Sequence, residues 1–182
     1  MSHPAFPAGL AQAMVLAAGR GERMRPLTDH CPKPLLPVRG QPLMQWPMQA
    51  LARGGFVRQL INTAWLGEQI EAQWGAQAHW PGLAPVQIAY SHEGRDFGRA
   101  LETAGGILRA LPALEEVFWV LAGDVHAPDF VFSAEAVQRF VASGRQAHLW
   151  LVPNPAHNAK GDFGLAPDGR VLNLPPGEPG RE

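Results

Sequence analysis

A glycine-bracketed arginine follows the first apolar run of the chain. Residues 13–18 (AMVLAA) lead into Gly19, Arg20 and Gly21, and further arginines follow at positions 23 and 25. Glycine lets backbone N–H groups come close to a phosphate and adopts a positive φ without strain. Arginine binds phosphate through paired hydrogen bonds. The turn therefore indicates phosphate binding, although an ordinary surface turn with scattered arginines fits the same letters. It is neither a dinucleotide fingerprint nor a P-loop.

Two further residues have side chains suited to phosphate and metal. Lys33 lies between two prolines, which restrict the backbone on both sides and favour a fixed direction for its ammonium group. Asp124 follows the β-prone run at 117–121 (VFWVL), where a carboxylate can hold a divalent cation beside substrate phosphates. Taken singly, each has an ordinary alternative: a surface lysine and a turn-forming aspartate.

The elements that must position these residues alternate between strand and helix. Residues 19–38 are too rich in glycine, proline and arginine for a regular element and predict a long loop. A small hairpin is expected between residues 163–165 and 170–174, around Asp168 and Gly169. The alternation predicts an α/β domain of Rossmann-like, three-layer form with a mostly parallel sheet, whose ligands bind at the carboxyl ends of the strands. The expected strands are 13–18, 57–63, 86–90, 117–121 and 147–152, and the expected helices are 42–55, 67–74, 102–111 and 133–143.

Composition excludes several classes of protein. The 182 residues carry a formal net charge of −1, which argues against a nucleic-acid or membrane-surface partner. No apolar run approaches the roughly 20 residues of a membrane span. The single cysteine, Cys31, cannot form an internal disulfide and is interpreted as an ordinary loop thiol. We expect a cytoplasmic protein with a flexible leader at 1–12 and one domain at 13–182.

Together, three motifs resemble the sugar-phosphate nucleotidylyltransferase family: LAAGRGERMRPLT at 16–28, PKPLLPV at 32–38 and GDV at 123–125. The resemblance spans most of the chain and implies the nucleotidyltransferase (glycosyltransferase-A-like) form of the α/β fold. It implies transfer of a nucleotidyl group from UTP, or another nucleoside triphosphate, to a sugar 1-phosphate, with release of pyrophosphate and with Mg²⁺ as the cofactor. INTAWLGEQI at 61–70, LETAGGIL at 101–108 and NPAHNAKGDFGL at 154–165 are similar to the branch that uses N-acetylmuramic acid 1-phosphate in bacterial peptidoglycan recycling.

The same motif matches imply roles for individual residues. Arg23 is expected to hold the β- and γ-phosphates, Lys33 to contact the α-phosphate and the sugar phosphate, and Asp124 to bind the metal. The expected nucleotide-binding residues are Ala17, Ala18, Gly19, Gly21, Arg23, Lys33 and Glu93. The expected sugar-phosphate-binding residues are Asn62, Glu102, Gly105, Asn154 and Asp162.

The chain departs from the family pattern in two places. The family pattern continues further and supplies a second metal-binding aspartate, so we expect the domain at 13–182 to lack the family's C-terminal portion. The loop at 94–101 is longer than in close relatives. Two other functions stay open: a thymidylyl- or guanylyltransferase acting on glucose or mannose 1-phosphate, and a non-catalytic module that binds nucleotide or sugar phosphate. The joint presence of Arg23, Lys33 and Asp124 favours an enzyme.

Overall fold

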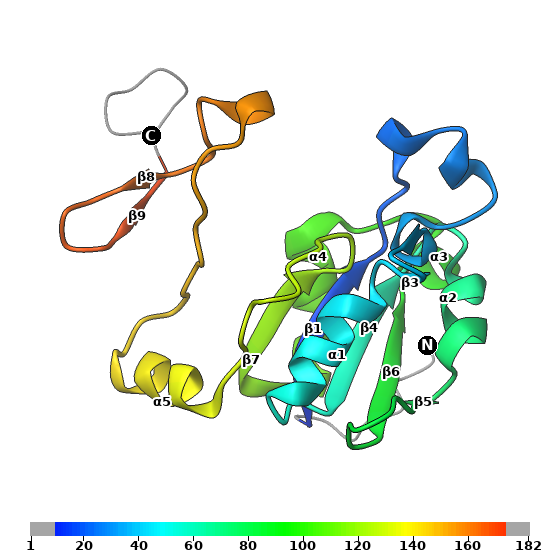
Figure 1. Cartoon of the computed structure of the whole chain (residues 1–182), viewed down its shortest axis with the longest axis horizontal. Coiled ribbons are helices and arrows are strands. Elements are labelled where there is room, and N and C mark those ends of the chain that lie inside the picture. The colour runs from blue at the N-terminus through cyan, green and yellow to red at the C-terminus, as the bar shows by residue number, and fades with distance from the viewer. Residues whose placement is uncertain (1–9, 174–182) are drawn as a thin grey trace. The chain divides into compact units, whose positions relative to one another are not determined.

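The computed structural model describes residues 10–173, and the chain divides into two compact units, Met1–Arg139 and Phe140–Glu182, which are considered separately (Figure 1). The first unit is built on a five-stranded sheet in the order β5-β6-β4-β1-β7. Strands β6, β4, β1 and β7 are parallel, and only β5 runs antiparallel to its neighbour. Their bounds are Ala11–Ala17 for β1, Arg58–Thr63 for β4, Gln77–Ala78 for β5, Val86–His92 for β6 and Leu114–Ala122 for β7.

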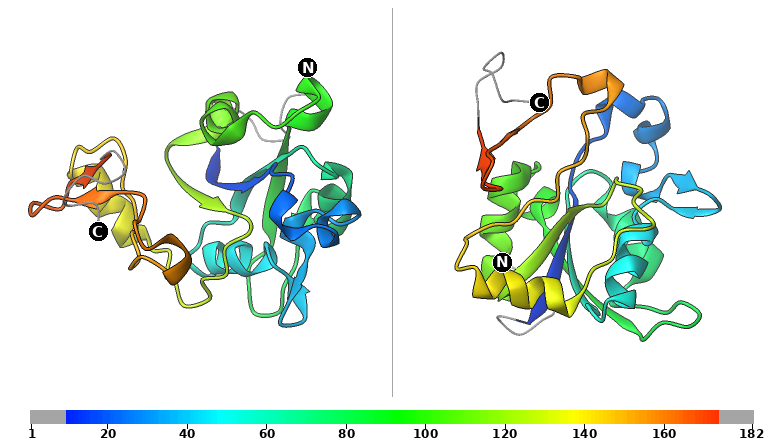
Figure 2. Two further views of the ribbon diagram at one scale, coloured as in Figure 1. Left: turned by 90° about the horizontal axis from the view of Figure 1, so that it is seen from above. Right: turned by 60° about the vertical axis from the view of Figure 1, so that its left-hand side comes forward.

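Helices cover both faces of this sheet, as Figure 2 shows from two further directions. On one face, Met48 and Leu51 of the first helix belong to the same buried cluster as Val15 and Ile61. On the other face, Met14 and Leu60 share a cluster with Ala110. Neighbouring residues of β1 thus serve opposite layers, as the alternation of side chains along a strand requires. The helices are α1 (Gln45–Arg53), α2 (Gly67–Trp74), α3 (Glu93–Phe97), α4 (Glu102–Ala110) and α5 (Ala134–Ala142). The predicted three-layer α/β fold is confirmed.

The predicted loop at 19–38 holds only short turns and one short strand. Three 3₁₀ turns follow one another and end in a two-stranded antiparallel hairpin. Proline and glycine explain this, since the four prolines of this stretch interrupt any longer helix. The turns are η1 (Glu22–Met24), η2 (Leu27–Asp29) and η3 (Lys33–Leu35), and the hairpin pairs β2 (Pro37–Val38) with β3 (Gln41–Pro42).

Several predicted boundaries shift because strand pairing decides them. β1 begins at Ala11, which pairs with Leu114, and β6 extends to His92, which pairs with Thr63. Of the leader expected at 1–12, residues 1–9 lie outside the described part, and residues 11–12 belong to β1.

Helix α1 begins at Gln45 instead of residue 42, and Pro47 falls in its first turn, where a missing N–H breaks no helical hydrogen bond.

The strand predicted at 147–152, in the second unit, is wrong. This segment has no regular structure and no partner strand within residues 10–173. Leu149, Trp150 and Leu151 are 45%, 48% and 42% exposed. A strand needs hydrogen-bond partners on a neighbouring strand, and an apolar, β-prone sequence does not supply them by itself.

The helix expected at 133–143 and the hairpin expected around Asp168 and Gly169 are confirmed in outline. Ser133 caps α5, because its Oγ accepts a hydrogen bond from the Ala136 N–H at 3.2 Å. The expected hairpin pairs β8 (Gly164–Leu165) with β9 (Val171–Leu172), and Gly169 takes a φ of 79° in its turn. Residue 174, included in that prediction, lies outside the described residues. A 3₁₀ turn, η5 (Ala156–Asn158), precedes the hairpin, and another, η4 (Leu111–Ala113), follows α4 in the first unit. No helix of residues 10–173 is long and apolar enough to cross a membrane.

Candidate active site

A cavity of about 560 Å³ lies in the first unit where the parallel strands end. The chain leaves β1 toward β4 on one side, and β7 later joins β1 on its other side, so β1 marks a topological switch. Ligands of open α/β sheets bind at such a switch, at the carboxyl ends of the strands. The volume falls within the range of small-molecule sites. Nine of the residues predicted from the sequence line this strand-end cavity: Ala17, Ala18, Gly19, Gly21, Arg23, Lys33, Asn62, Glu102 and Asp124.

Lys33 and Asp124 are joined to each other in this cavity. The Lys33 Nζ donates a hydrogen bond to Asp124 Oδ2 at 2.5 Å, and the two side chains are 25% and 36% exposed. Lys33 opens the turn η3 between Pro32 and Pro34, and the Leu36 N–H closes that turn on the Lys33 carbonyl at 3.1 Å. The prolines therefore hold the lysine backbone as the sequence suggested. The structure places a cation and a carboxylate together at the switch between β1 and β7.

Gly21 is required by both its conformation and its surroundings. Its φ is 69°, a left-handed value that favours glycine, and an added Cβ would lie 3.1 Å from the Cβ of Lys33 and from the Cγ2 of Thr28. Thr28 is fully buried, and its hydroxyl donates to the Gly21 carbonyl at 2.9 Å. Around Gly19, by contrast, an added Cβ would meet nothing within 4 Å. Gly21 therefore fixes the turn against the loop that carries Lys33.

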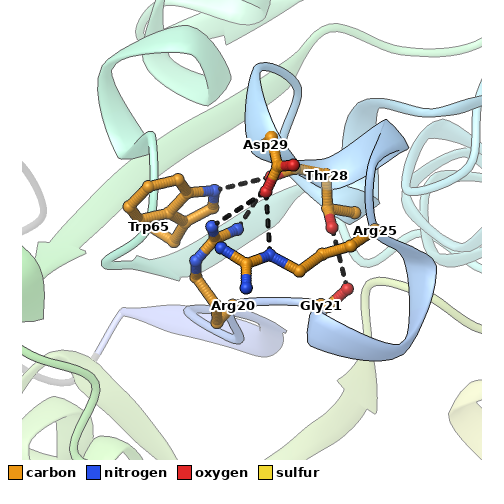
Figure 3. Close-up of polar contacts among 6 residues, drawn as sticks. All are labelled: Arg20, Gly21, Arg25, Thr28, Asp29 and Trp65. Atoms are coloured by element: carbon orange, nitrogen blue, oxygen red, sulfur yellow. Dashed lines mark hydrogen bonds and ion pairs between the residues drawn. The ribbon is translucent and has the colours of Figure 1, made fainter.

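The three arginines of the loop have different surroundings, and Figure 3 shows two of them, Arg20 and Arg25. The Arg20 guanidinium lies over the Trp65 ring, 3.5 Å from its centroid, and donates to Asp29 Oδ1 at 3.2 Å. Arg25 donates to the same oxygen at 2.8 Å. Its hydrogen bond, with that of Arg20, holds the pKa of Asp29 below its usual value. Arg23 lines the cavity and makes no hydrogen bond or ion pair within the described residues.

The carbonyl of Thr28 completes this arrangement. It accepts a hydrogen bond from Arg20 at 2.8 Å and another from the Trp65 indole N–H at 3.0 Å. Neither Trp65 nor Asp29 is among the site residues predicted from the sequence. Trp65 lies just after β4, at the edge where the other site residues gather, and that position was the available signal. Arg20, Asp29, Thr28 and Trp65, here called the loop clamp, tie the loop after β1 to the end of β4.

Glu102 lines the cavity with an unusual backbone. It is the first residue of α4 and has a φ of 60°, which is uncommon for a residue with a side chain. Such strain persists where the surrounding structure imposes it, and it concentrates at functional sites. Two other predicted residues stand outside the cavity lining. Gly105 lies one turn further along α4, and Glu93 is fully buried behind Asn62.

Asn154 and Asp162 belong to the second unit. The Asn154 side chain donates to the Ala159 carbonyl at 3.3 Å, and the Asn158 side chain donates to Asp162 Oδ1 at 3.2 Å. Gly161 adopts a φ of 64° beside the Asn154 side chain. Both predicted residues thus take part in the local turn around η5, and their contact with a sugar stays a prediction.

The chain belongs to the nucleotidyl transferase family, whose model matches residues 12–172. This confirms the resemblance drawn from the three motifs. The chain is 49% identical over 161 residues to N-acetylmuramate alpha-1-phosphate uridylyltransferase of Neisseria meningitidis serogroup B, a match that covers 88% of this chain and 67% of the relative. It is 37% identical over 121 residues to UTP–glucose-1-phosphate uridylyltransferase of Synechocystis, which covers 62% of this chain and 30% of the relative. The chain therefore spans about two thirds of one curated relative and about a third of the other.

A solved structure supports the fold. HddC from Yersinia pseudotuberculosis, complexed with GMP-PN, superimposes with a TM-score of 0.59 at 20% sequence identity, over 88% of this chain and 72% of that chain. At this identity the likeness concerns the fold alone. It agrees with the parallel sheet and flanking helices described above.

Proposed function

We propose that this chain transfers a uridylyl group from UTP to N-acetylmuramic acid 1-phosphate. A phosphate oxygen of the sugar phosphate attacks the α-phosphorus of UTP in line. The bond from that phosphorus to the bridging oxygen breaks, and pyrophosphate leaves with the bond's electron pair. The 49% identity to the Neisseria enzyme supports the choice of substrates. The observation that carries the reaction class is the gathering of Arg23, Lys33 and Asp124 in one cavity behind the Gly21 turn.

The residues of the cavity suit catalysis by positioning and charge neutralisation. Such transfers need little covalent help from the protein, since the barrier falls when the reactants are aligned and the developing charge is balanced. Arg23, with no partner among the described residues, is available for the β- and γ-phosphates. Lys33 would turn from Asp124 to the α-phosphate and the sugar phosphate. Backbone groups of Ala17, Ala18 and Gly19 would border the base and ribose.

Asp124 is the residue that would hold a divalent metal ion, and Mg²⁺ is the ion we propose. Within residues 10–173 no group of three or more His, Cys, Asp or Glu side chains is placed to hold a metal. A single carboxylate is nevertheless suitable for Mg²⁺, which takes its other ligands from phosphates and water. The structure supports the fit, because Asp124 already faces a cation, the Lys33 ammonium, inside the cavity. When bound, Mg²⁺ would withdraw charge from the phosphate oxygens.

The sugar side of the cavity is proposed to lie at Asn62 and at the start of α4. The Glu102 carboxylate can accept hydrogen bonds from sugar hydroxyl or amide groups, and Asn62 can donate and accept. Gly105 would give close backbone access. The reaction would serve peptidoglycan recycling in the cytoplasm, where nucleoside triphosphates are made.

Glucose 1-phosphate is the second candidate acceptor, because of the 37% identity to the Synechocystis enzyme. A substrate panel separates the two. Pyrophosphate release is measured with UTP, dTTP or GTP, each with N-acetylmuramic acid, glucose or mannose 1-phosphate and Mg²⁺. A kcat/KM that is highest for UTP with the muramic substrate supports the proposal. A preference for another pair overturns the substrate assignment. Nucleotide binding by calorimetry without any release would point to a non-catalytic module instead.

A further inference from the structure

Glu93 is a fully buried carboxylate just behind the strand-end cavity. It opens α3 directly after β6, and its side chain is 0% exposed. Its Oε1 accepts a hydrogen bond from the Asn62 amide at 2.7 Å, and its Oε2 accepts one from the Leu101 N–H at 2.7 Å. A buried charge is tolerated when it has such partners. Each carboxylate oxygen of Glu93 therefore accepts a hydrogen bond inside the protein.

Asn62 extends these contacts to the other side of the cavity. Its Oδ1 accepts a hydrogen bond from the Ala17 N–H at 2.8 Å. The path runs from the Ala17 N–H through the Asn62 amide and the Glu93 carboxylate to the Leu101 N–H. We call these four groups the buried relay. Its first end is the last residue of β1, just before the glycine turn, and its second end immediately precedes Glu102, whose φ is 60°.

Helix α4 encloses the relay closely. A Cβ on Gly106 would lie 2.6 Å from Glu93 Oε1 and 2.9 Å from the Asn62 amide nitrogen. On the next residue after Glu93, a Cβ on Gly94 would lie 2.6 Å from the Ala64 carbonyl oxygen. Asn62 itself is only 3% exposed. With this packing, neither side chain can move without moving the backbone around it.

We propose that Glu93 is a positioning residue that fixes the nucleotide side and the sugar side of the cavity relative to each other through Asn62. The naming of the two sides rests on the proposed function; the relay itself does not. Both terminal groups are backbone donors, so Asn62 must accept at one end and donate at the other, and Glu93 must accept at both. The order of donors and acceptors along the relay therefore requires an amide at 62 and a carboxylate at 93.

The donor order provides a sharp test with substitutions of nearly equal size. In Glu93→Gln, the new NH₂ group faces either the Asn62 NH₂ or the Leu101 N–H, so one pair becomes donor against donor. In Asn62→Asp, two buried carboxylates face each other. The double variant Asn62→Asp/Glu93→Gln restores one donor for each acceptor, with the same net charge as the natural chain. Glu116→Gln, at an exposed position of β7, is the matched control.

The first readout is hydrogen exchange of the Ala17 and Leu101 backbone amides in the full chain, measured by NMR. We expect each single variant to lose protection at one or both amides and the double variant to regain it at both. Unchanged protection at both amides in Glu93→Gln overturns the relay. So does a double variant as unprotected as the single variants. This readout needs no turnover, so it decides the relay even if no substrate pair releases pyrophosphate and the proposed function fails.

The second readout separates positioning from mere stabilisation. Pyrophosphate release by Glu93→Gln is measured below its melting temperature, with the folded fraction checked by circular dichroism. Positioning predicts a kcat lowered by about 10- to 100-fold, because small misplacements of reacting groups are costly. The KM for UTP is expected to change by much less. A kcat per folded molecule equal to that of Glu116→Gln, with only the melting temperature lowered, would overturn the positioning role.

Discussion

Lys33 and Asp124 stand 91 positions apart in the chain and meet at 2.5 Å in the strand-end cavity. The pair connects the loop after β1 to the turn after β7. In the proposed reaction each group has a different partner, the lysine a phosphate and the aspartate a metal ion. Binding of nucleotide and metal would therefore exchange one ion pair for two new contacts. Until then, each group neutralises the charge of the other inside the cavity.

The pair predicts that Lys33 competes with metal for Asp124. Without nucleotide, Lys33→Ala should bind Mn²⁺, used as a spectroscopic probe, more tightly than the natural chain. Both side chains are partly exposed, and such pairs contribute about 0.2–1 kcal/mol, so the gain should be at most about fivefold. Electron paramagnetic resonance titration measures it. Asp124→Asn should remove the site, whereas Glu116→Gln should not. Weaker Mn²⁺ binding by Lys33→Ala would contradict the competition.

The loop clamp predicts unequal roles for two arginines that share Asp29. Arg20 also stacks on Trp65 and bonds the Thr28 carbonyl, whereas Arg25 is 57% exposed and pairs with Asp29 alone. Arg20→Ala should lower the free energy of unfolding by about 1–3 kcal/mol and weaken nucleotide binding. Arg25→Ala should cost about 0–1 kcal/mol and leave binding nearly unchanged. Urea unfolding and calorimetry measure both effects. Equal losses of stability and of nucleotide binding from the two substitutions would contradict this prediction. They would show that the contacts of Arg20 with Trp65 and Thr28 add nothing to its pairing with Asp29.

The burial of His92 predicts that the folded chain loses stability in mild acid. Burial lowers the pKa of His92 below its ordinary value of 6.5, although the carboxylate of Glu71, 2.8 Å away, acts in the opposite direction. The unfolded chain therefore takes up a proton first as the pH falls, so the folded state loses stability from about pH 6.5 downward. His92→Gln should flatten this slope in urea unfolding between pH 5 and 8. An unchanged slope would exclude His92 as its source. The other charged groups that act on it are Arg95, Asp96 and Arg109.

Cys31 is predicted to react slowly with thiol reagents. Partial burial raises the pKa of its thiol above the ordinary value of 9.0, and its Sγ lies 3.7 Å from the Pro32 carbonyl oxygen. The thiolate is the reactive form, so at pH 7 less of it is present than in a free cysteine. Labelling of the folded chain should be slower than labelling in denaturant and should accelerate as the pH rises toward 10. Labelling at pH 7 as fast as that of a free cysteine would contradict this prediction.

The sequence predicted the elements whose pattern is local and complete. Helix α2 occupies the predicted residues 67–74 without change, because its apolar positions and its C-terminal Gly75 lie within a single short stretch. The strand expected at 147–152 failed for the opposite reason, since its apolar letters needed a partner strand elsewhere in the chain. The start of β1 and the end of β6 also differ from the predicted bounds, because pairing with Leu114 extends β1 and pairing with Thr63 extends β6.

The site was predictable where motif residues follow parallel strands directly. Gly21 and Asp124 lie within four residues of the ends of β1 and β7, Lys33 belongs to a motif in the same loop as Gly21, and the structure brings all three to one cavity. Glu93 was expected at the nucleotide but lies behind Asn62, because its placement depends on the close approach of α4 through Gly106. Sequence spacing contains no information about that approach. The loop clamp was not predicted for a similar reason, since the stacking of Arg20 on Trp65 joins two segments that are distant in the sequence.

We propose that nucleotidyl transfer takes place at Lys33 in the strand-end cavity. The most direct measurement is the rate of pyrophosphate release from UTP and N-acetylmuramic acid 1-phosphate with Mg²⁺, by the natural chain, Lys33→Ala and Glu116→Gln. We predict that Lys33→Ala lowers kcat by about 100- to 1,000-fold, as the loss of one group that stabilises developing charge does elsewhere. Glu116→Gln should match the natural chain. Turnover by Lys33→Ala at the rate of the natural chain would contradict the claim.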